Sequence, residues 1–182
     1  SPDDDAIAWR NWRATQVNVL MKRLRDMVDR TKRGVALTTA VGADPDRAFN
    51  GHYQDARKWI TQGWVDGVFT MNYASAMGEF EGRFAKWQPW MAQRPVATGI
   101  MFDQRDPSLV QGQVTSAVRN GTHFAAFAYN SMFERRDASG RPAMDAQSPS
   151  RQQLRQGVLP LVQNLAAAEK KSPQASALAG SR

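Results

Sequence analysis

The sequence predicts an α/β protein in which parallel strands alternate with helices. Four short apolar runs begin near residues 35, 65, 95 and 122, so successive starts are about 30 residues apart. Each gap carries apolar residues three or four positions apart, which is the spacing of an amphipathic helix. Strands that alternate with helical patterns in this way indicate βα units and a parallel sheet.

The chain opens with a long helix predicted over residues 6–32. Its apolar side chains recur at helical spacing, and the aspartates at positions 3–5 complement the positive end of the helix dipole. Gly34 ends this helix, and the β-favouring run 35–41 gives the first strand. Residues 44–51 contain proline, asparagine and glycine, so we predict a loop at the carboxyl end of that strand.

The next repeat is a helix, a turn and a strand within residues 54–73. Gly63 can adopt the left-handed conformation that ends a helix. The apolar run 65–71 then fits a strand that is buried on both faces, as parallel strands are. The carboxyl end of this strand presents Asn72 and Tyr73, and parallel α/β folds place their ligands at that end. We therefore expect the functional site there.

The rest of the chain repeats the pattern twice more. Residues 95–102 and 122–129 are predicted as the third and fourth strands, and an amphipathic helix precedes each of them. A polar loop over 135–148 leads into a last helix, and small and polar residues predict a flexible tail over 172–182.

The period of the repeat matches a (β/α)8 TIM barrel. Such a barrel spends roughly 250 residues on eight units, about 31 on each, whereas this chain carries four. Four parallel strands with an open edge would leave backbone groups unpaired. We therefore expect half of a barrel, completed by a missing N-terminal half or by a second chain. A self-sufficient four-stranded sheet with helices on both faces is the alternative.

Composition limits the possible functions. The 182 residues are 42% hydrophobic, enough for one packed core, and no apolar run approaches the ~20 residues that cross a bilayer. Absence of cysteine excludes disulfides and thiolate metal sites, and two histidines are too few for a histidine-rich one, so we predict no metal or cofactor. The net charge of +7 raises the question of an anionic partner, but most basic residues fit solvated helix faces.

Four segments occur in a distinctive order along the chain: W-R-N-W-R at 9–13, Y-Q-D-A-R-K-W at 53–59, G-W-V-D at 63–66 and M-N-Y at 71–73. Together they resemble the family-ten-like glycosyl hydrolases, bacterial glycosidase-like proteins with a TIM-barrel domain. The resemblance covers roughly residues 6–133. Of the family's usual P-Q-x-Y-W segment, only Tyr73 is matched.

The resemblance implies that the four predicted strands are strands 5 to 8 of the barrel. Residues 1–171 are then the C-terminal half of a glycosidase-like barrel with its terminal helix. The acidic and aromatic cluster that looks like the family's catalytic centre lies upstream of this half. A periplasmic or extracellular location is implied in the same way.

Candidate site residues follow from the chemistry of glycoside hydrolysis, which needs carboxyl groups across the scissile bond. Asp103 directly follows the third strand and is the candidate catalytic residue. Asn72, Tyr73, Tyr129 and Asn130 are the candidate sugar-binding residues, because amides and phenols hydrogen-bond hydroxyl groups and aromatic rings stack on sugars. Further acidic residues at the same edge are Asp44, Asp46, Glu79, Glu81 and Glu134.

Three functions remain open at this point. The first is a glycoside hydrolase that acts on a bacterial cell-envelope or exopolysaccharide glycan, with part of its active site outside this chain. The second is a non-catalytic barrel that binds a polysaccharide or oligosaccharide. The third, a basic nucleic-acid-binding domain, is favoured least because no aromatic platform is expected among the basic residues. We expect the tryptophans on helical stripes, Trp12, Trp59 and Trp87, to pack between helices and sheet.

Overall fold

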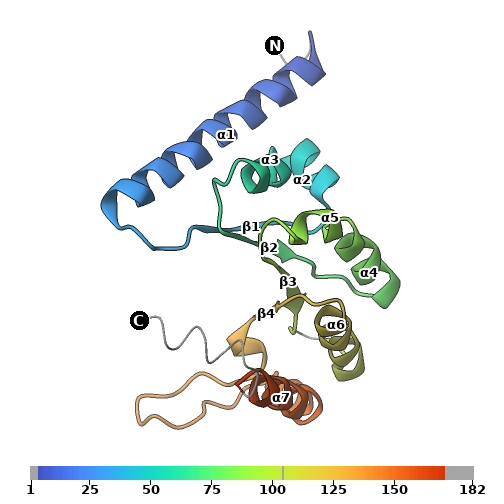
Figure 1. Ribbon diagram of the computed structural model, residues 1–182. Helices are drawn as coiled ribbons and strands as arrows, with labels where there is room; N and C mark the ends of the chain where they lie inside the picture. Colours follow the sequence, from blue (N-terminus) through green and yellow to red (C-terminus); the bar gives the residue numbers. More distant parts are fainter. Residues whose placement is uncertain (1–3, 104, 171–182) are drawn as a thin grey trace. The chain divides into compact units, whose positions relative to one another are not determined.

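The computed structural model of the protein describes residues 4–103 and 105–170. It contains a sheet with the strand order β1-β2-β3-β4 (Figure 1). The strands are Thr38–Gly42 (β1), Gly67–Met71 (β2), Val96–Met101 (β3) and Phe124–Phe127 (β4). β1 pairs with β2 and β2 with β3 in parallel, and backbone hydrogen bonds join β3 to β4. The predicted α/β class, with parallel strands in chain order, is confirmed.

In the described part of the chain, helices precede the first strand, lie in each gap between strands and follow the last strand. They are Ala6–Thr31 (α1), Pro45–His52 (α2), Ala56–Thr61 (α3), Met77–Ala85 (α4), Gln88–Met91 (α5), Pro107–Arg119 (α6) and Ser148–Lys170 (α7). Gly63 takes a φ of 66° just beyond α3, as its predicted helix-ending role requires. None of the helices in the described part of the chain is long and apolar enough to cross a membrane. The tail predicted over 172–182 lies outside the described residues.

One element was predicted wrongly. Residues 44–51 were expected to form a loop, but most of this segment belongs to α2. The side chain of Asp44 accepts hydrogen bonds from the backbone N–H groups of Asp46 and Arg47, and Pro45 occupies the first turn. These are the features that start a helix. An eight-residue helix offers few apolar positions, and the cap was the clearest signal for its start.

The described residues divide into two compact units. Those up to 100, together with 114–126, form the first unit, and the rest form the second. The first unit has a buried cluster made of Met21, Val41, Ala56, Trp59, Ile60, Val65, Val68, Trp87 and Val96. In the second unit Val110 of α6 and Leu154 and Val158 of α7 are buried, and Gln111 Nε2 donates a hydrogen bond to the carbonyl oxygen of Gly157.

Two of the three tryptophans expected to pack inside do so. Trp59 and Trp87 are buried, and their indole N–H groups donate to Asn18 Oδ1 at 2.6 Å and to the Ala43 carbonyl oxygen at 2.7 Å. The prediction for Trp12 is wrong, because its side chain is 54% exposed. The buried residues of α1 are Ala14, Asn18 and Met21, and Trp12 is not on the side of the helix that they occupy.

The central strand β2 shows how the two faces of the sheet differ. Val68 and Thr70 are buried, whereas Phe69 and Met71 are 40% and 39% exposed. Neighbouring residues of a strand point to opposite faces. Within the described part of the chain, therefore, one face of β2 is covered and the other carries exposed apolar side chains.

Candidate functional site

Asp103 is the acidic residue whose carboxylate is left without a partner at the end of a strand. It lies two residues after β3 and is exposed. Its side chain makes no hydrogen bond or ion pair with the rest of the described chain. A carboxylate in this state is accessible to an external proton donor or acceptor, which is what acid–base chemistry requires.

The pocket beside Asp103 lies entirely within the second unit and has a volume of about 470 Å³. The segment after β3 supplies Phe102, Asp103, Arg105 and Asp106, and the start of α7 supplies most of the other wall. The polar side chains of that second wall are Gln147, Ser150, Arg151 and Gln153. Amides, hydroxyls and guanidinium groups around a partly apolar floor suit a ligand that carries many hydroxyl groups.

The second carboxylate of this pocket, Asp106, is committed to the fold. Its Oδ1 accepts hydrogen bonds from the backbone N–H groups of Ser108 at 2.8 Å and Leu109 at 3.2 Å, and also from the Ser108 hydroxyl. The Ser108 hydroxyl, followed by these N–H groups, holds the pKa of Asp106 below its ordinary value. Asp106 therefore stays ionised as the cap of α6 and is a poor proton donor.

Asp44 is engaged in a similar way at the end of β1. Burial raises its pKa, but hydrogen bonds from Lys86 Nζ and from the backbone of Arg47 and Asp46 outweigh burial, so the net shift is downward. The Lys86 Nζ to Asp44 Oδ2 distance is 2.7 Å. Asp44 is thus an ionised helix cap with its own cation.

The remaining acidic residues predicted for this edge also have partners. Glu79 pairs with Arg83, Asp46 with Arg57 at 2.9 Å and Glu134 with Arg155 at 3.0 Å, and Glu81 accepts a hydrogen bond from Ser116 Oγ at 3.2 Å. Of the six acidic residues named from the sequence, Asp103 alone has no such interaction with described residues.

The two residues at the end of β2 point to different faces. Asn72 is 1% exposed, and its Nδ2 donates to the carbonyl oxygen of Phe80 in α4 at 2.9 Å, while its buried Oδ1 has no hydrogen-bond partner. Tyr73 is half-buried, and its ring approaches the position that a side chain at Gly99 would occupy. The Tyr73 hydroxyl is protonated at neutral pH, as phenols ordinarily are, and burial raises its pKa further. A role in sugar binding stays a prediction for both residues.

Tyr129 and Asn130 form a short turn directly after β4, in the second unit. Tyr129 is largely exposed, and its ring stacks on Phe133 with centroids 4.7 Å apart. The backbone carbonyl oxygen of Asn130 accepts a hydrogen bond from Arg151 Nε at 2.9 Å. Arg151 also lines the pocket of Asp103, so this turn and the pocket are linked through one side chain. The roles predicted for Tyr129 and Asn130 are likewise untested.

Sequence reasoning missed the α7 wall of the pocket. Gln147, Ser150 and Gln153 lie at the start of a helix whose beginning at Ser148 was predicted. The available signal was the run of polar side chains on its first turns. The spacing of these residues in the sequence, however, did not indicate that the first turns of α7 line the same pocket as the segment after β3.

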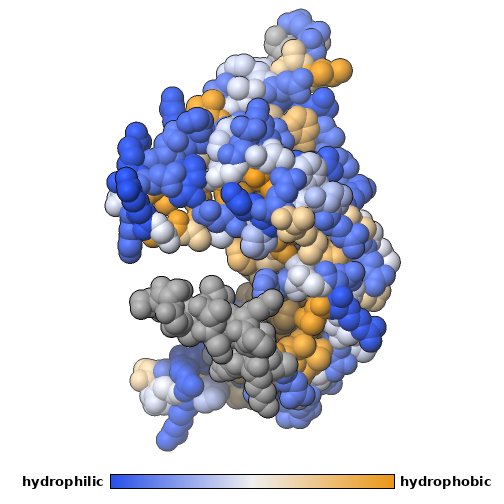
Figure 2. Space-filling view, viewed as in Figure 1, coloured by the Kyte–Doolittle hydropathy of each residue, from blue (hydrophilic) through white to orange (hydrophobic). Residues whose placement is uncertain are grey.

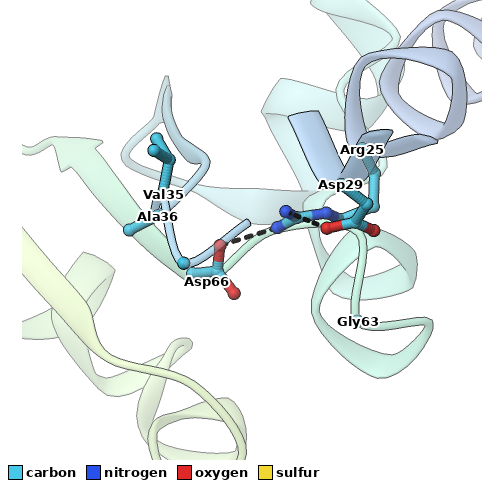
Figure 3. A pocket seen from close by; sticks show the side chains of 7 residues that line it. Arg25, Asp29, Val35, Ala36, Gly63 and Asp66 are labelled. Atoms are coloured by element: carbon cyan, nitrogen blue, oxygen red, sulfur yellow. Dashed lines mark hydrogen bonds and ion pairs between the residues drawn. The ribbon is translucent and has the colours of Figure 1, made fainter. Parts of the chain in front are cut away.

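A second hollow, of about 550 Å³, lies at the amino ends of β1 and β2 in the first unit. Figure 3 shows Arg25 reaching both Asp29 and Asp66 there. Asp66 Oδ2 accepts from Arg25 Nη1 and from the backbone N–H of Leu37, each at 2.7 Å. These bonds fasten α1 to the strands, and the amino ends of parallel strands are where stability rather than chemistry is usually found.

No cluster of three metal-ligating side chains occurs in the described part of the chain. No curated protein matches the sequence. A family model, glycosyl hydrolase-like 10, matches residues 1–119, which is more than half of the 182 residues. The matched segment includes β1, β2, β3 and the pocket residues that follow β3. The chain therefore belongs to the glycosyl hydrolase-like 10 family.

Proposed function

We propose that the protein is a glycoside hydrolase domain that acts on a bacterial cell-envelope or exopolysaccharide glycan. Membership of a glycosyl hydrolase-like family supports a glycosidase-like function. The observation that carries the proposal is the unpaired carboxylate of Asp103 in a polar pocket directly after β3. Every other acidic candidate on this edge is held by a cation, a hydroxyl or a helix N-terminus.

In this proposal Asp103 is one of the two carboxyl groups that glycoside hydrolysis uses. One group protonates the leaving oxygen and the other activates water or attacks the sugar carbon. Asp106 is a poor proton donor because its pKa is lowered, and its Oδ1 is already engaged by the capping bonds from Ser108 and Leu109, so we do not assign it the role of nucleophile or base either. The second carboxyl group then comes from outside this chain, on the upstream strand that the sequence resemblance implies.

The barrel proposal concerns the sheet. We take β1 to β4 as strands 5 to 8 of a (β/α)8 barrel whose remaining strands cover the face that carries Phe69 and Met71. Side chains fill the interior of such barrels, so exposed apolar residues on one face of a parallel sheet support the assignment. A thiol placed at Phe69→Cys should react rapidly in this chain and slowly in a longer protein that includes upstream strands. Equal reactivity in both would refute the assignment.

The hydrolase proposal is tested with a panel of cell-envelope and exopolysaccharide oligosaccharides. The protein, supplied with its upstream half or a completing chain, is expected to release reducing sugar from at least one of them. Asp103→Asn should lower the rate by about 10²–10⁴-fold, the range for loss of a general acid or base. Glu81→Gln is the matched control, since Glu81 only accepts a bond from Ser116. Equal turnover by Asp103→Asn would remove Asp103 from the mechanism.

A non-catalytic carbohydrate-binding domain is the second candidate. The described residues contain a single unpaired carboxylate at this edge, which favours binding if no partner carboxyl is supplied. In that case the same panel would give binding without release of reducing sugar, and Asp103→Asn would change affinity only. We also propose a periplasmic or extracellular location, which fractionation of the native host would test.

A further inference from the structure

The amino-terminal turns of α1 carry an exposed cluster of aromatic and guanidinium side chains. Trp9 and Trp12 are three residues apart and so share one face of the helix. They are 36% and 54% exposed, and their rings stack with centroids 5.1 Å apart and planes 14° apart. Figure 2 shows hydrophobic residues among hydrophilic ones near the N-terminal end of the molecule. The pair presents aromatic surface to solvent beside basic side chains of the same helix, so the expectation that no aromatic platform lies among the basic residues is wrong.

Two arginines are held against aromatic rings at the same place. The guanidinium carbon of Arg13 lies 5.8 Å from the ring centroid of Trp9 and 4.4 Å from that of Tyr53, and its Nη1 donates to the Tyr53 hydroxyl at 2.9 Å. Arg10 lies over Phe49 at 5.6 Å. We name Trp9, Arg10, Trp12, Arg13 and Tyr53 the tryptophan–arginine platform.

The arginines of the platform keep charge and donors for an external partner. Neither Arg10 nor Arg13 joins an ion pair with a described residue. Arg10 Nη1 donates a hydrogen bond to Asn50 Oδ1 at 2.9 Å, and Arg13 Nη1 donates one to the Tyr53 hydroxyl. A guanidinium group has five N–H donors in a fixed fork that matches a carboxylate. Side chains fixed by aromatic contacts bind such an anion with little loss of freedom.

The backbone at Tyr53 contributes to this arrangement. Tyr53 ends α2 with a φ of 59°, an uncommon conformation for a residue other than glycine. The next residue, Gln54, accepts a hydrogen bond at its Oε1 from the N–H of Gly42, the last residue of β1. The Tyr53 side of the platform therefore adjoins the carboxyl end of a parallel strand, where ligands bind in this fold class.

We propose that the tryptophan–arginine platform binds a glycan whose sugars carry carboxylate groups. A pyranose ring stacks on the exposed faces of the tryptophans, and its carboxylate meets the guanidinium groups of Arg13 and Arg10. This inference rests on the proposed function, since it assigns an acidic class of substrate to a glycan-binding protein. It adds a subsite on α1 that is made of residues other than those of the Asp103 pocket.

Two matched ligands test the platform by titration calorimetry. They are β-1,4-mannohexaose and β-1,4-hexamannuronate, which differ only in the carboxylates at C6. The acidic hexamer should bind more tightly, with an advantage that falls as salt is added. Arg13→Met should remove most of that advantage, about 10- to 100-fold in affinity, as expected for hydrogen bonds to a charged group. Trp12→Ala should weaken binding of both hexamers.

Leu20→Ala is the control, because Leu20 is an equally exposed apolar residue on the same helix. It should leave both affinities unchanged. An equal loss of affinity in Leu20→Ala would mean that the effect is not specific to the platform residues, and the platform would be refuted. Unchanged binding in Trp12→Ala, or no binding of either hexamer, would refute it as well. Tighter, Trp12-dependent binding of a single-stranded hexanucleotide would assign the platform to nucleic acid instead. Turnover that is lost in Asp103→Asn but kept in Trp12→Ala would overturn this inference and leave the hydrolase proposal standing.

Discussion

Replacing Asp66 with alanine tests how the first unit holds α1 against its strands. The change leaves the N–H of Leu37 without its acceptor and removes one of the two carboxylates that Arg25 contacts. A hydrogen bond to a charged group contributes about 1.5–3 kcal/mol, but the Asp66 side chain is 40% exposed, so water reduces the effect. We expect a loss of about 1–2 kcal/mol in the free energy of unfolding, which lowers Tm by roughly 2–8 °C.

The pH dependence of this loss identifies the carboxylate as its source. The hydrogen bond from Leu37, and then that from Arg25, lower the pKa of Asp66 against the opposing effect of burial. A group whose pKa is lower in the folded state stabilises the protein above its unfolded value, about 3.9 for aspartate. That contribution disappears as the pH falls through the folded value. The difference between wild type and Asp66→Ala should therefore be full at pH 7 and shrink below about pH 4.

Urea denaturation followed by circular dichroism at several pH values measures this difference. Asp29→Ala is the matched control, because Asp29 contacts the same guanidinium group of Arg25 but only as an exposed helical pair. It should cost no more than about 0.5 kcal/mol. An Asp66→Ala loss that is the same at pH 3 and pH 7, or an equal loss in Asp29→Ala, would refute the reasoning.

Two further predictions concern the first unit, one about close packing and one about a buried hydrogen bond, and both are checked by urea denaturation. Gly99→Ala should destabilise the protein by about 1–3 kcal/mol, because the added Cβ would lie 2.6 Å from the Thr70 carbonyl oxygen. Gly82→Ala in α4 is the control: its Cβ meets open space, so it should stabilise the protein by up to about 1 kcal/mol. An unchanged stability in Gly99→Ala would contradict this reasoning. Asn18→Ala should cost about 1–3 kcal/mol, since it leaves the buried indole N–H of Trp59 without its acceptor, and a loss within experimental error would mean that another acceptor replaces it.

The strands were predictable because their apolar runs are separated by clear helical patterns. The run predicted at 65–71 became Gly67–Met71, and the boundaries of the other strands moved by a few residues. The α2 helix was not predicted, since its proline, asparagine and glycine are also the residues of loops. Its N-cap at Asp44, followed by Pro45, was the physical signal that outweighed composition.

The site was less predictable because a residue's place in the chain does not fix its surroundings. Asn72 and Tyr73 both follow β2, yet their side chains lie on opposite faces of the sheet, because neighbouring residues of an extended chain alternate. The strand itself is apolar on both faces, so its sequence does not indicate which face is covered. Asp103 could be nominated from its position after a strand. The sequence could not show that Asp103 lacks an ion-pair partner. The pairing of the other acidic residues depends on residues far away in the sequence, such as Lys86 for Asp44 and Arg155 for Glu134. The exposure of Trp12 was equally hidden, since helical spacing does not say which stripe faces the core.

One face of β2 links the barrel proposal to the sugar-binding proposal. Phe69, Met71 and Tyr73 are alternate residues and so share the face that the described chain leaves open. Gly99 in β3 leaves room for the Tyr73 ring. A Cβ at position 99 would lie 3.4 Å from that ring and would also meet the Thr70 carbonyl oxygen. A protonated phenol can donate a hydrogen bond to a sugar hydroxyl, and burial, which raises the pKa of Tyr73, favours this protonated form further. Strands that cover Phe69 and Met71 would also enclose Tyr73 at the mouth of the barrel. If Phe69 proves accessible in the longer protein, Tyr73 loses the enclosure that sugar binding at this position requires.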